Sequence, residues 1–223
     1  MSVSEMLEAR ISIRAYEDRP VDEATVRSLL DSARWSPSGG NLQPWKVIAV
    51  AGAAKDEVVR IATQRLMLDA RGEVGERPVY PENLWEPYRS RRFKVGEDMY
   101  ALLGIPREDK AARLRWFARN YTFFGAPVGL FFAIDRSMGY GQWAHLGMFM
   151  QSLALVAEER GLSTCMQEAW AMVRDTLGAH FSLEPSEMLY CGMALGYADR
   201  QAPVNKLRTD RVPVDEFATF RGF

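Results

Sequence analysis

Apolar residues recur at helical spacing in two stretches of the first third of the chain. After Asp22 an apolar stripe begins at Val26, so we predict a helix that Asp22 caps and that runs to about residue 34. Residues 56–68 show the same amphipathic spacing and predict a further helix. Ser2 and Glu5 fit a capping box, which predicts a short first helix over residues 3–9.

Four short apolar runs have the length and composition of buried strands. They cover residues 46–50, 128–134, 162–166 and 188–195. The tail from residue 197 onward lacks helical periodicity until Asp215, so we expect it to wrap around another body rather than fold by itself.

Residues 141–160 predict the longest helix, and this helix is apolar on nearly every side. The stretch between Arg136 and Glu158 carries no formal charge, and it is long enough to span a membrane. Three glycines and polar residues such as Gln142 and His145 argue against a span. We therefore expect a helix that is buried on every side.

Residues 65–121 have a different character, because charged and aromatic residues alternate and several prolines interrupt the early part. Long segments of this kind often form lids over active sites. A solvated helical hairpin has the same composition, so both interpretations stand. Arg89, Arg91 and Arg92 would attract an anionic aromatic acid if the segment covers a site.

Composition narrows the class of protein. With 223 residues, 48% of them hydrophobic, the chain can bury a sizeable core as one domain over residues 1–223. The formal net charge of −1 provides no general attraction to nucleic acid or to an anionic membrane. The N-terminus lacks the cationic and apolar regions of a secretory signal, so we expect a cytoplasmic protein. Cys165 and Cys191 lie in apolar runs and are expected to be reduced core thiols.

Several chemistries lack the residues that they need. The two histidines, His145 and His180, lie in different segments, so neither a metal site nor a His-dependent triad is expected. Ser38 lacks the preceding glycine of a nucleophile elbow. No Gly-x-Gly-x-x-Gly follows a predicted strand, so a separate dinucleotide domain is not expected.

Residues 36–45 form the stretch that is least suited to a core. They read Ser-Pro-Ser-Gly-Gly-Asn-Leu-Gln-Pro-Trp, between a predicted helix and a predicted strand, and they offer many hydrogen bonds to a ligand. Gly39 and Gly40 let the backbone approach a flat, bulky group without a β-carbon in the way. An ordinary turn has a similar composition. The flanking Trp35 and Trp45 favour a binding loop.

Arg10, Ser12 and Arg14 follow the first predicted helix at alternate positions. In an extended segment alternate side chains point the same way, so two guanidinium groups and a hydroxyl can converge on one anion. Scattered surface arginines are the alternative for this segment taken alone.

Three motifs occur in a set order along the chain. They are Arg-x-Ser-x-Arg at residues 10–14, Pro-Ser-Gly-Gly-Asn-x-Gln-Pro-Trp at residues 37–45, and Arg-x-Pro at residues 211–213. Together they resemble the FMN-dependent nitroreductase family. The resemblance extends from residue 6 to about residue 217 and is weakest over residues 65–121.

The resemblance implies an α+β fold with three layers, α-β-α, and a mixed, mainly antiparallel sheet. It further implies an intertwined homodimer with residues 141–160 in the dimer core and residues 197–223 as an extension that wraps the partner. Residues 65–121 would form a variable lid over the cofactor.

The resemblance also implies an FMN at each dimer interface, with no catalytic side chain and no metal. Arg10 and Ser12 would hold the phosphate and ribityl end, and Arg14 would face the flavin ring. Arg211 would neutralise the phosphate with help from Arg208, although Thr209 stands where the family usually carries a second basic residue.

The other expected contacts come from two further segments. Pro37, Ser38 and Asn41 would reach the FMN that the other subunit mainly binds, and the backbone near Glu168 and Ala169 would face flavin N5. The complete set of expected cofactor-binding residues is Arg10, Ile11, Ser12, Arg14, Pro37, Ser38, Gly39, Asn41, Gln43, Gln167, Glu168, Ala169, Arg208 and Arg211.

The implied activity is hydride transfer from NAD(P)H through the flavin to small nitroaromatic or quinone-like acceptors. Ping-pong kinetics are expected because a nicotinamide would have to share the flavin's pocket. Residues 80–92 look most like the nitrobenzoate and dinitroaniline reductase branch. Two alternatives stay open: a same-fold enzyme that fragments flavin with oxygen or removes a halogen, and a flavin-storage or flavin-sensing protein without turnover.

Overall fold

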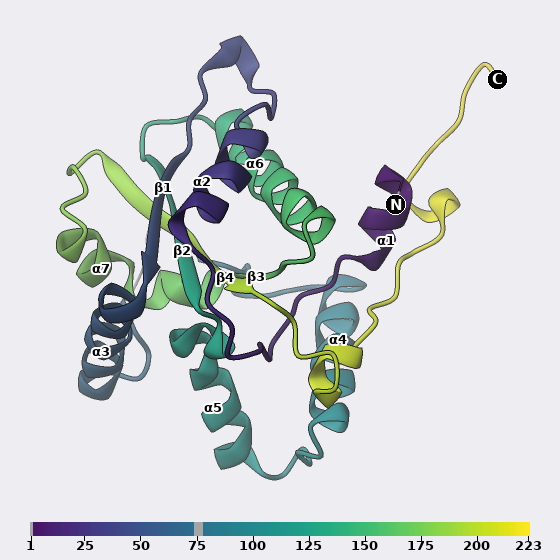
Figure 1. The fold of residues 1–223 in the computed structure, drawn as a ribbon. Coiled ribbons are helices and arrows are strands. Elements are labelled where there is room, and N and C mark those ends of the chain that lie inside the picture. Colours follow the sequence, from purple (N-terminus) through teal and green to yellow (C-terminus); the bar gives the residue numbers. More distant parts are fainter. Residues whose placement is uncertain (1, 74–77) are drawn as a thin grey trace.

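A four-stranded sheet organises the chain (Figure 1). The computed structural model describes residues 2–73 and 78–223. The strands lie in the order β1 (Lys46–Ala51), β2 (Val128–Asp135), β4 (Glu187–Gly196) and β3 (Ser163–Gln167). All four predicted strands are confirmed. Each neighbouring pair is antiparallel, so the parallel part of the expected mixed sheet is not found among the described residues.

Helices cover both faces of the sheet, which confirms the three-layer α-β-α architecture. One face carries α2 (Glu23–Ala33) and α6 (Tyr140–Glu159), and the other carries α3 (Gly52–Leu68) and α7 (Arg174–His180). Because side chains alternate along β2, Leu130 and Phe132 enter the first core while Phe131 enters the second.

Two glycines let aromatic rings lie directly on the second face of the sheet. A β-carbon at Gly192 would approach the Trp170 ring to 2.2 Å, and one at Gly129 would approach the Phe123 ring to 2.2 Å. The Trp170 and Phe123 ring centroids are 4.7 Å apart. This packing holds the turn after β3, where residues 167–169 lie.

Local capping signals place the first helices. The capping box at Ser2 starts α1 (Val3–Ala9), and the Asp22 carboxylate accepts a hydrogen bond from Thr25 N at 2.6 Å to start α2. Both helices were predicted. In contrast, α3 begins at Gly52, four residues before the predicted start. No side-chain cap or apolar stripe marks that earlier beginning.

Residues 65–121 contain α4 (Tyr88–Leu102) and α5 (Lys110–Ala118), which project from the sheet (Figure 1). Neither helix has a buried residue. An ion pair of 2.5 Å between Arg113 and Glu97 joins them. This arrangement agrees with a solvated helical hairpin, and residues 74–77 of the expected lid lie outside the described residues.

The expected burial of residues 141–160 on every side is found on one side in the single chain, and the other side stays an expectation for the dimer. One side of α6 packs in the first core through residues such as Leu146, Phe149 and Leu153. The opposite side is open, with Tyr140 at 87% and Met148 at 43% exposure. Across the described ranges, 2–73 and 78–223, no helix combines the length and hydropathy that crossing a membrane would require.

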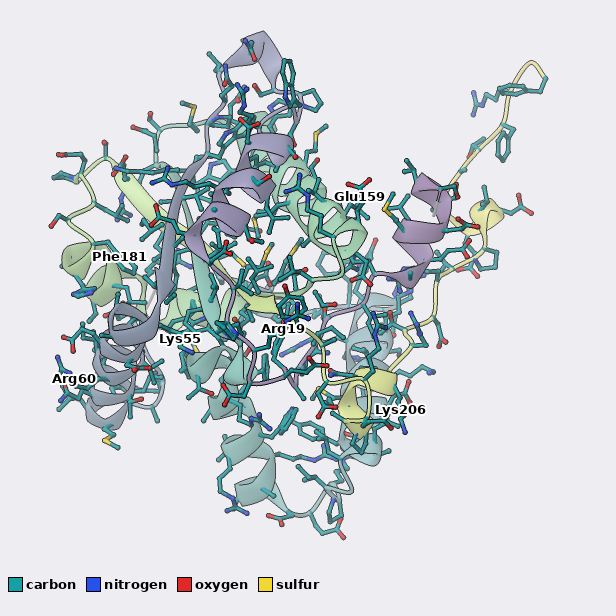
Figure 2. All side chains as sticks on the ribbon, viewed as in Figure 1. Arg19, Lys55, Arg60, Glu159, Phe181 and Lys206 are labelled. Atoms are coloured by element: carbon teal, nitrogen blue, oxygen red, sulfur yellow. The ribbon has the colours of Figure 1, made fainter. Side chains whose placement is uncertain are left out.

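Short 3-10 helices and an extended tail complete the chain. The 3-10 helices are η1 (Gly39–Asn41), η2 (Arg119–Gly125), η3 (Glu168–Val173), η4 (Pro203–Lys206) and η5 (Val214–Glu216). Figure 2 labels Lys206 in η4, which lies against α4, and the tail then extends away from the body. Its last aromatic residues, Phe217, Phe220 and Phe223, are exposed.

Candidate functional site

Residues 10–14 run as an extended segment beside the edge strand β3. Ile13 N donates a hydrogen bond to Thr164 O at 3.0 Å. Next to it, burial raises the pKa of the Cys165 thiol, while the charge of Arg14, a hydrogen bond with Ser12 and the charge of Arg10 act in the opposite direction. The structure therefore gathers the three polar side chains of the first motif around one point of β3.

Two guanidinium groups lie where α1 ends. Arg10 is the C-cap residue of α1, and Arg208 Nη1 donates to Ala9 O at 3.2 Å and to Glu8 O at 3.4 Å. The Nε of Arg10 is buried and has no hydrogen-bond acceptor among the described residues. A buried donor without an acceptor is costly, so this corner is suited to an anion supplied from outside the chain.

Asn205 is a site residue that the sequence analysis missed. Its buried side chain accepts from Arg14 N at 2.7 Å and donates to Ala15 O at 2.8 Å and to Asp199 O at 2.7 Å. It thus ties the tail to the first motif. No local sequence pattern links Asn205 to Arg14, which lies 191 positions earlier. The signal that the sequence does offer is Pro203, which predicts a turn at this point.

Residues 167–169 lie at the end of β3, on the same strand that carries Cys165. The Gln167 amide is buried and donates to Asn120 O at 2.8 Å, so this side chain serves the fold. Glu168 is exposed, and its Oε1 accepts a hydrogen bond of 3.5 Å from the Tyr190 hydroxyl. Partial burial raises the pKa of Glu168, which the Tyr190 hydrogen bond opposes.

The loop of residues 36–45 lies apart from the first motif, on the N-terminal half of α6. Its Gly39 contacts His145 of α6, whereas Glu158 of the same helix lines a cavity of about 100 Å³ together with Ile11 and Arg208. His145 and Glu158 are thirteen residues apart, and at 1.5 Å per residue the loop and the first motif are separated by about 20 Å. Figure 2 labels Glu159 at the end of α6 that lies nearest α1.

The two tryptophans beside the loop have different roles. Trp45 stacks on Phe149 of α6 with a centroid distance of 4.8 Å, so it belongs to the core. Trp35 is 79% exposed beside Arg34. The two tryptophans flank the loop as predicted, but only Trp35 is open to solvent in the single chain.

Arg211 lies beside α4. Its Nη1 donates to Thr209 Oγ1 at 2.6 Å and to Asp210 O at 2.8 Å. It lines a groove of about 290 Å³ with Lys94 and other residues of α4. Among the expected phosphate ligands, Arg208 lies beside α1 and Arg211 lies in this separate groove.

Comparison with known proteins gives a consistent result. The sequence model of the Nitroreductase family matches residues 7–197. The chain is 37% identical over 217 residues to a 4-nitrobenzoate reductase of Pseudomonas putida, covering 96% of this chain and 93% of that protein. It is 34% identical over 218 residues to a nitrobenzene nitroreductase of Ectopseudomonas oleovorans, covering 98% and 96%.

Solved structures support the same assignment. The FMN and NADPH-dependent nitroreductase NfnB from Sphigopyxis sp. strain HMH superposes with a TM-score of 0.97 at 45% identity, over 100% of both chains. The FMN-dependent nitroreductase NfnB from Mycobacterium smegmatis, solved in complex with NADPH, superposes with a TM-score of 0.91 at 29% identity, over 98% of this chain and 97% of that one. With its fold, its motifs and most of its length matched, this chain belongs to the nitroreductase family.

Proposed function

We propose that this chain is an FMN-dependent oxidoreductase that uses NAD(P)H to reduce small nitroaromatic compounds. The observation that carries this proposal is the buried Arg10 Nε, which has no acceptor in the described residues and lies with Ser12 and Arg208 at the end of α1. The names of related nitroreductases that depend on FMN and NADPH support it.

The residues at this corner fit the phosphate end of FMN. A phosphate oxygen would accept from the Arg10 Nε–H and from the Ser12 hydroxyl, which would remove the cost of the unpaired donor. Arg208 and Arg211 would add positive charge, Arg211 after its side chain leaves Thr209.

The reacting end of the cofactor would lie toward Arg14 and residues 167–169. When bound, FMN supplies hydride acceptance from a nicotinamide and delivery of reducing equivalents to a nitro group. The guanidinium of Arg14 would stabilise negative charge that develops on reduction. The Gln167 side chain is engaged with Asn120, and Ala169 O accepts from the Tyr121 hydroxyl at 3.1 Å. The backbone N–H groups of Glu168 and Ala169 are therefore the groups of this turn that we assign to flavin contact.

A second copy of the chain would complete the site. The loop residues Pro37, Ser38, Gly39, Asn41 and Gln43 lie about 20 Å from the first motif, so they would serve the FMN of a partner. The cavity of about 100 Å³ beside the first motif is well below the roughly 300–1,000 Å³ of typical ligand pockets, which also favours a site shared between chains.

The open side of α6 is the surface we assign to the homodimer. It presents Tyr140, Ala144, Gly147 and Met148 in successive turns, without a charge. The tail of residues 197–223 would wrap the partner, because its exposed phenylalanines need apolar cover. We propose that the dimer acts in the cytoplasm, where NAD(P)H is available.

A colour test separates this function from flavin storage. The purified protein should be yellow, should lose its colour with NADPH or NADH under nitrogen, and should regain it when nitrobenzoate or nitrobenzene is added. A protein that stays yellow with both nicotinamides would contradict the enzymatic function. Recovery of colour with oxygen or halogenated aromatics but not with nitroarenes would favour one of the other chemistries.

A further inference from the structure

The peptide groups of Gly39 are held from both sides by one turn of α6. Gly39 N donates a hydrogen bond to His145 Nδ1 at 3.3 Å, and Gln142 Nε2 donates to Gly39 O at 3.3 Å. Gln142 and His145 are three residues apart, so they share one face of the helix. The contact therefore uses the N–H and the C=O of a single loop residue.

The loop lies so close to α6 at Gly39 that a larger residue would crowd the two side chains. A β-carbon at Gly39 would lie 3.1 Å from His145 Cε1 and 3.4 Å from Gln142 Nε2. The hydrogen-bond directions also define the state of both side chains. His145 accepts at Nδ1 and so carries its proton on Nε2, and the Gln142 amide turns its nitrogen toward Gly39.

The shape of the loop comes from its own residues. Gln43 N donates to Ser38 Oγ at 2.9 Å, and Gly40, Asn41 and Gln43 have positive φ values of 62°, 52° and 50°. Most of these residues are exposed. Hydrogen bonds within the loop determine its shape, but they do not fix its position on the protein surface. The side chains of Gln142 and His145 in α6 fix that position through Gly39.

Gln142 carries a further sign of an incomplete site. Its Oε1 is buried and has no hydrogen-bond donor among the described residues. Buried acceptors of this kind are usually satisfied in the functional assembly. A donor from a second molecule would complete the hydrogen bonds of this side chain.

We propose that His145 and Gln142 are positioning residues that place the cofactor loop through Gly39. This inference rests on the proposed function, in which Pro37, Ser38 and Asn41 contact FMN. The two side chains belong to α6, which we also assign to the dimer, so the helix that joins the subunits would orient the loop that serves the partner's cofactor.

The test compares three substitutions with a matched histidine control. His145→Leu removes the acceptor, His145→Asn supplies an amide oxygen near the position of Nδ1, and Gln142→Leu removes the donor. His180→Leu changes the other histidine, which is exposed at the end of α7. FMN affinity is measured from the quenching of flavin fluorescence, and exchange of the amides of residues 36–45 is measured by mass spectrometry on the apoprotein.

His145→Leu and Gln142→Leu should each weaken FMN binding about three- to tenfold, the effect of one ordinary hydrogen bond. Exchange should become faster in the loop but not in β2, and His145→Asn should restore both properties. His180→Leu should match the unaltered protein. Equal loss in His145→Leu and His145→Asn would mean that packing alone matters, and unchanged affinity with unchanged exchange would refute the anchor. If the unaltered protein binds no FMN, the proposed function fails, while the exchange data still judge the anchor.

Discussion

The side chain of Asn205 accepts a hydrogen bond from the backbone N–H of Arg14 at 2.7 Å. The same amide donates to Ala15 O and Asp199 O, so one buried residue joins the C-terminal segment to the motif near the N-terminus. Ala15 O and Asp199 O also accept from backbone N–H groups, at 3.1 Å and 3.3 Å, so Asn205 is the acceptor for the Arg14 N–H and one of two donors to each carbonyl.

Replacing Asn205 by Ala should lower the free energy of unfolding of the apoprotein by roughly 1–3 kcal/mol, because the Arg14 N–H loses its acceptor and two carbonyls each lose one of their two donors in a buried place. Urea denaturation measures this change. Asn83→Ala, at an exposed position, is the control and should have little effect. A loss equal to that of the control would show that water replaces the amide without cost.

Arg10→Ala and Arg211→Ala should each weaken FMN binding by roughly ten- to a hundredfold, the effect of one charge-assisted contact to phosphate. The control is Arg27→Ala, because Arg27 is 76% exposed and pairs with Glu23 on α2. Fluorescence titration with FMN provides the affinities. Unchanged affinity in Arg211→Ala would leave Arg208 as the basic residue of the tail that holds the phosphate.

Ala144→Glu should convert the protein to a monomer and reduce its FMN content, because the charge would be buried against a second α6 without a partner. Sedimentation velocity at micromolar concentration determines the mass, and absorbance determines the bound flavin. Ala53→Glu, on the exposed start of α3, should remain dimeric. A stable, FMN-loaded monomer of the unaltered chain would contradict the shared site.

Tyr190 should make stability depend on alkaline pH. Burial, with a smaller contribution from Glu168, raises the pKa of Tyr190 to about 12. The unfolded phenol titrates near 10, so the folded state holds the proton longer. The contribution of Tyr190 is complete below about pH 10 and is lost as the pH rises toward about 12.

The stability advantage of the unaltered protein over Tyr190→Phe should therefore fall by about 1 kcal/mol between about pH 9 and pH 11, after allowance for partial exposure. Urea denaturation at several pH values gives the two curves. Tyr80→Phe, at a position with 47% exposure and outside α6, is the control. Parallel curves for the unaltered protein and Tyr190→Phe would refute the effect of burial.

Reduction of a nitroarene should follow ping-pong kinetics. No Gly-x-Gly-x-x-Gly follows a strand of the described residues, so we expect the nicotinamide and the aromatic acceptor to occupy the same place in turn, with reacting atoms within roughly 3–3.5 Å. Double-reciprocal plots should be parallel, and benzoate should compete with NAD(P)H. Intersecting lines would mean that both substrates bind together.

Much of the fold follows from local patterns in the sequence. The four strands and the starts of α1 and α2 were predicted because apolar runs and N-cap hydrogen bonds depend on residues close together in the chain. The start of α3 was predicted late because no cap marks Gly52. The three motifs were sufficient to predict the family.

Tertiary structure decided how those motifs are arranged. Sequence order could not reveal that Arg14 depends on Asn205, since 191 positions separate them and no periodicity links them. It also could not reveal that α6 is open on one side, because an apolar residue has the same letter whether it faces a core or a second subunit. The loop contacts α6 at His145 and the first motif lies beside Glu158 of the same helix, so the rise of the helix separates them by about 20 Å. That separation depends on which residues of α6 each segment packs against, and only the folded chain decides this.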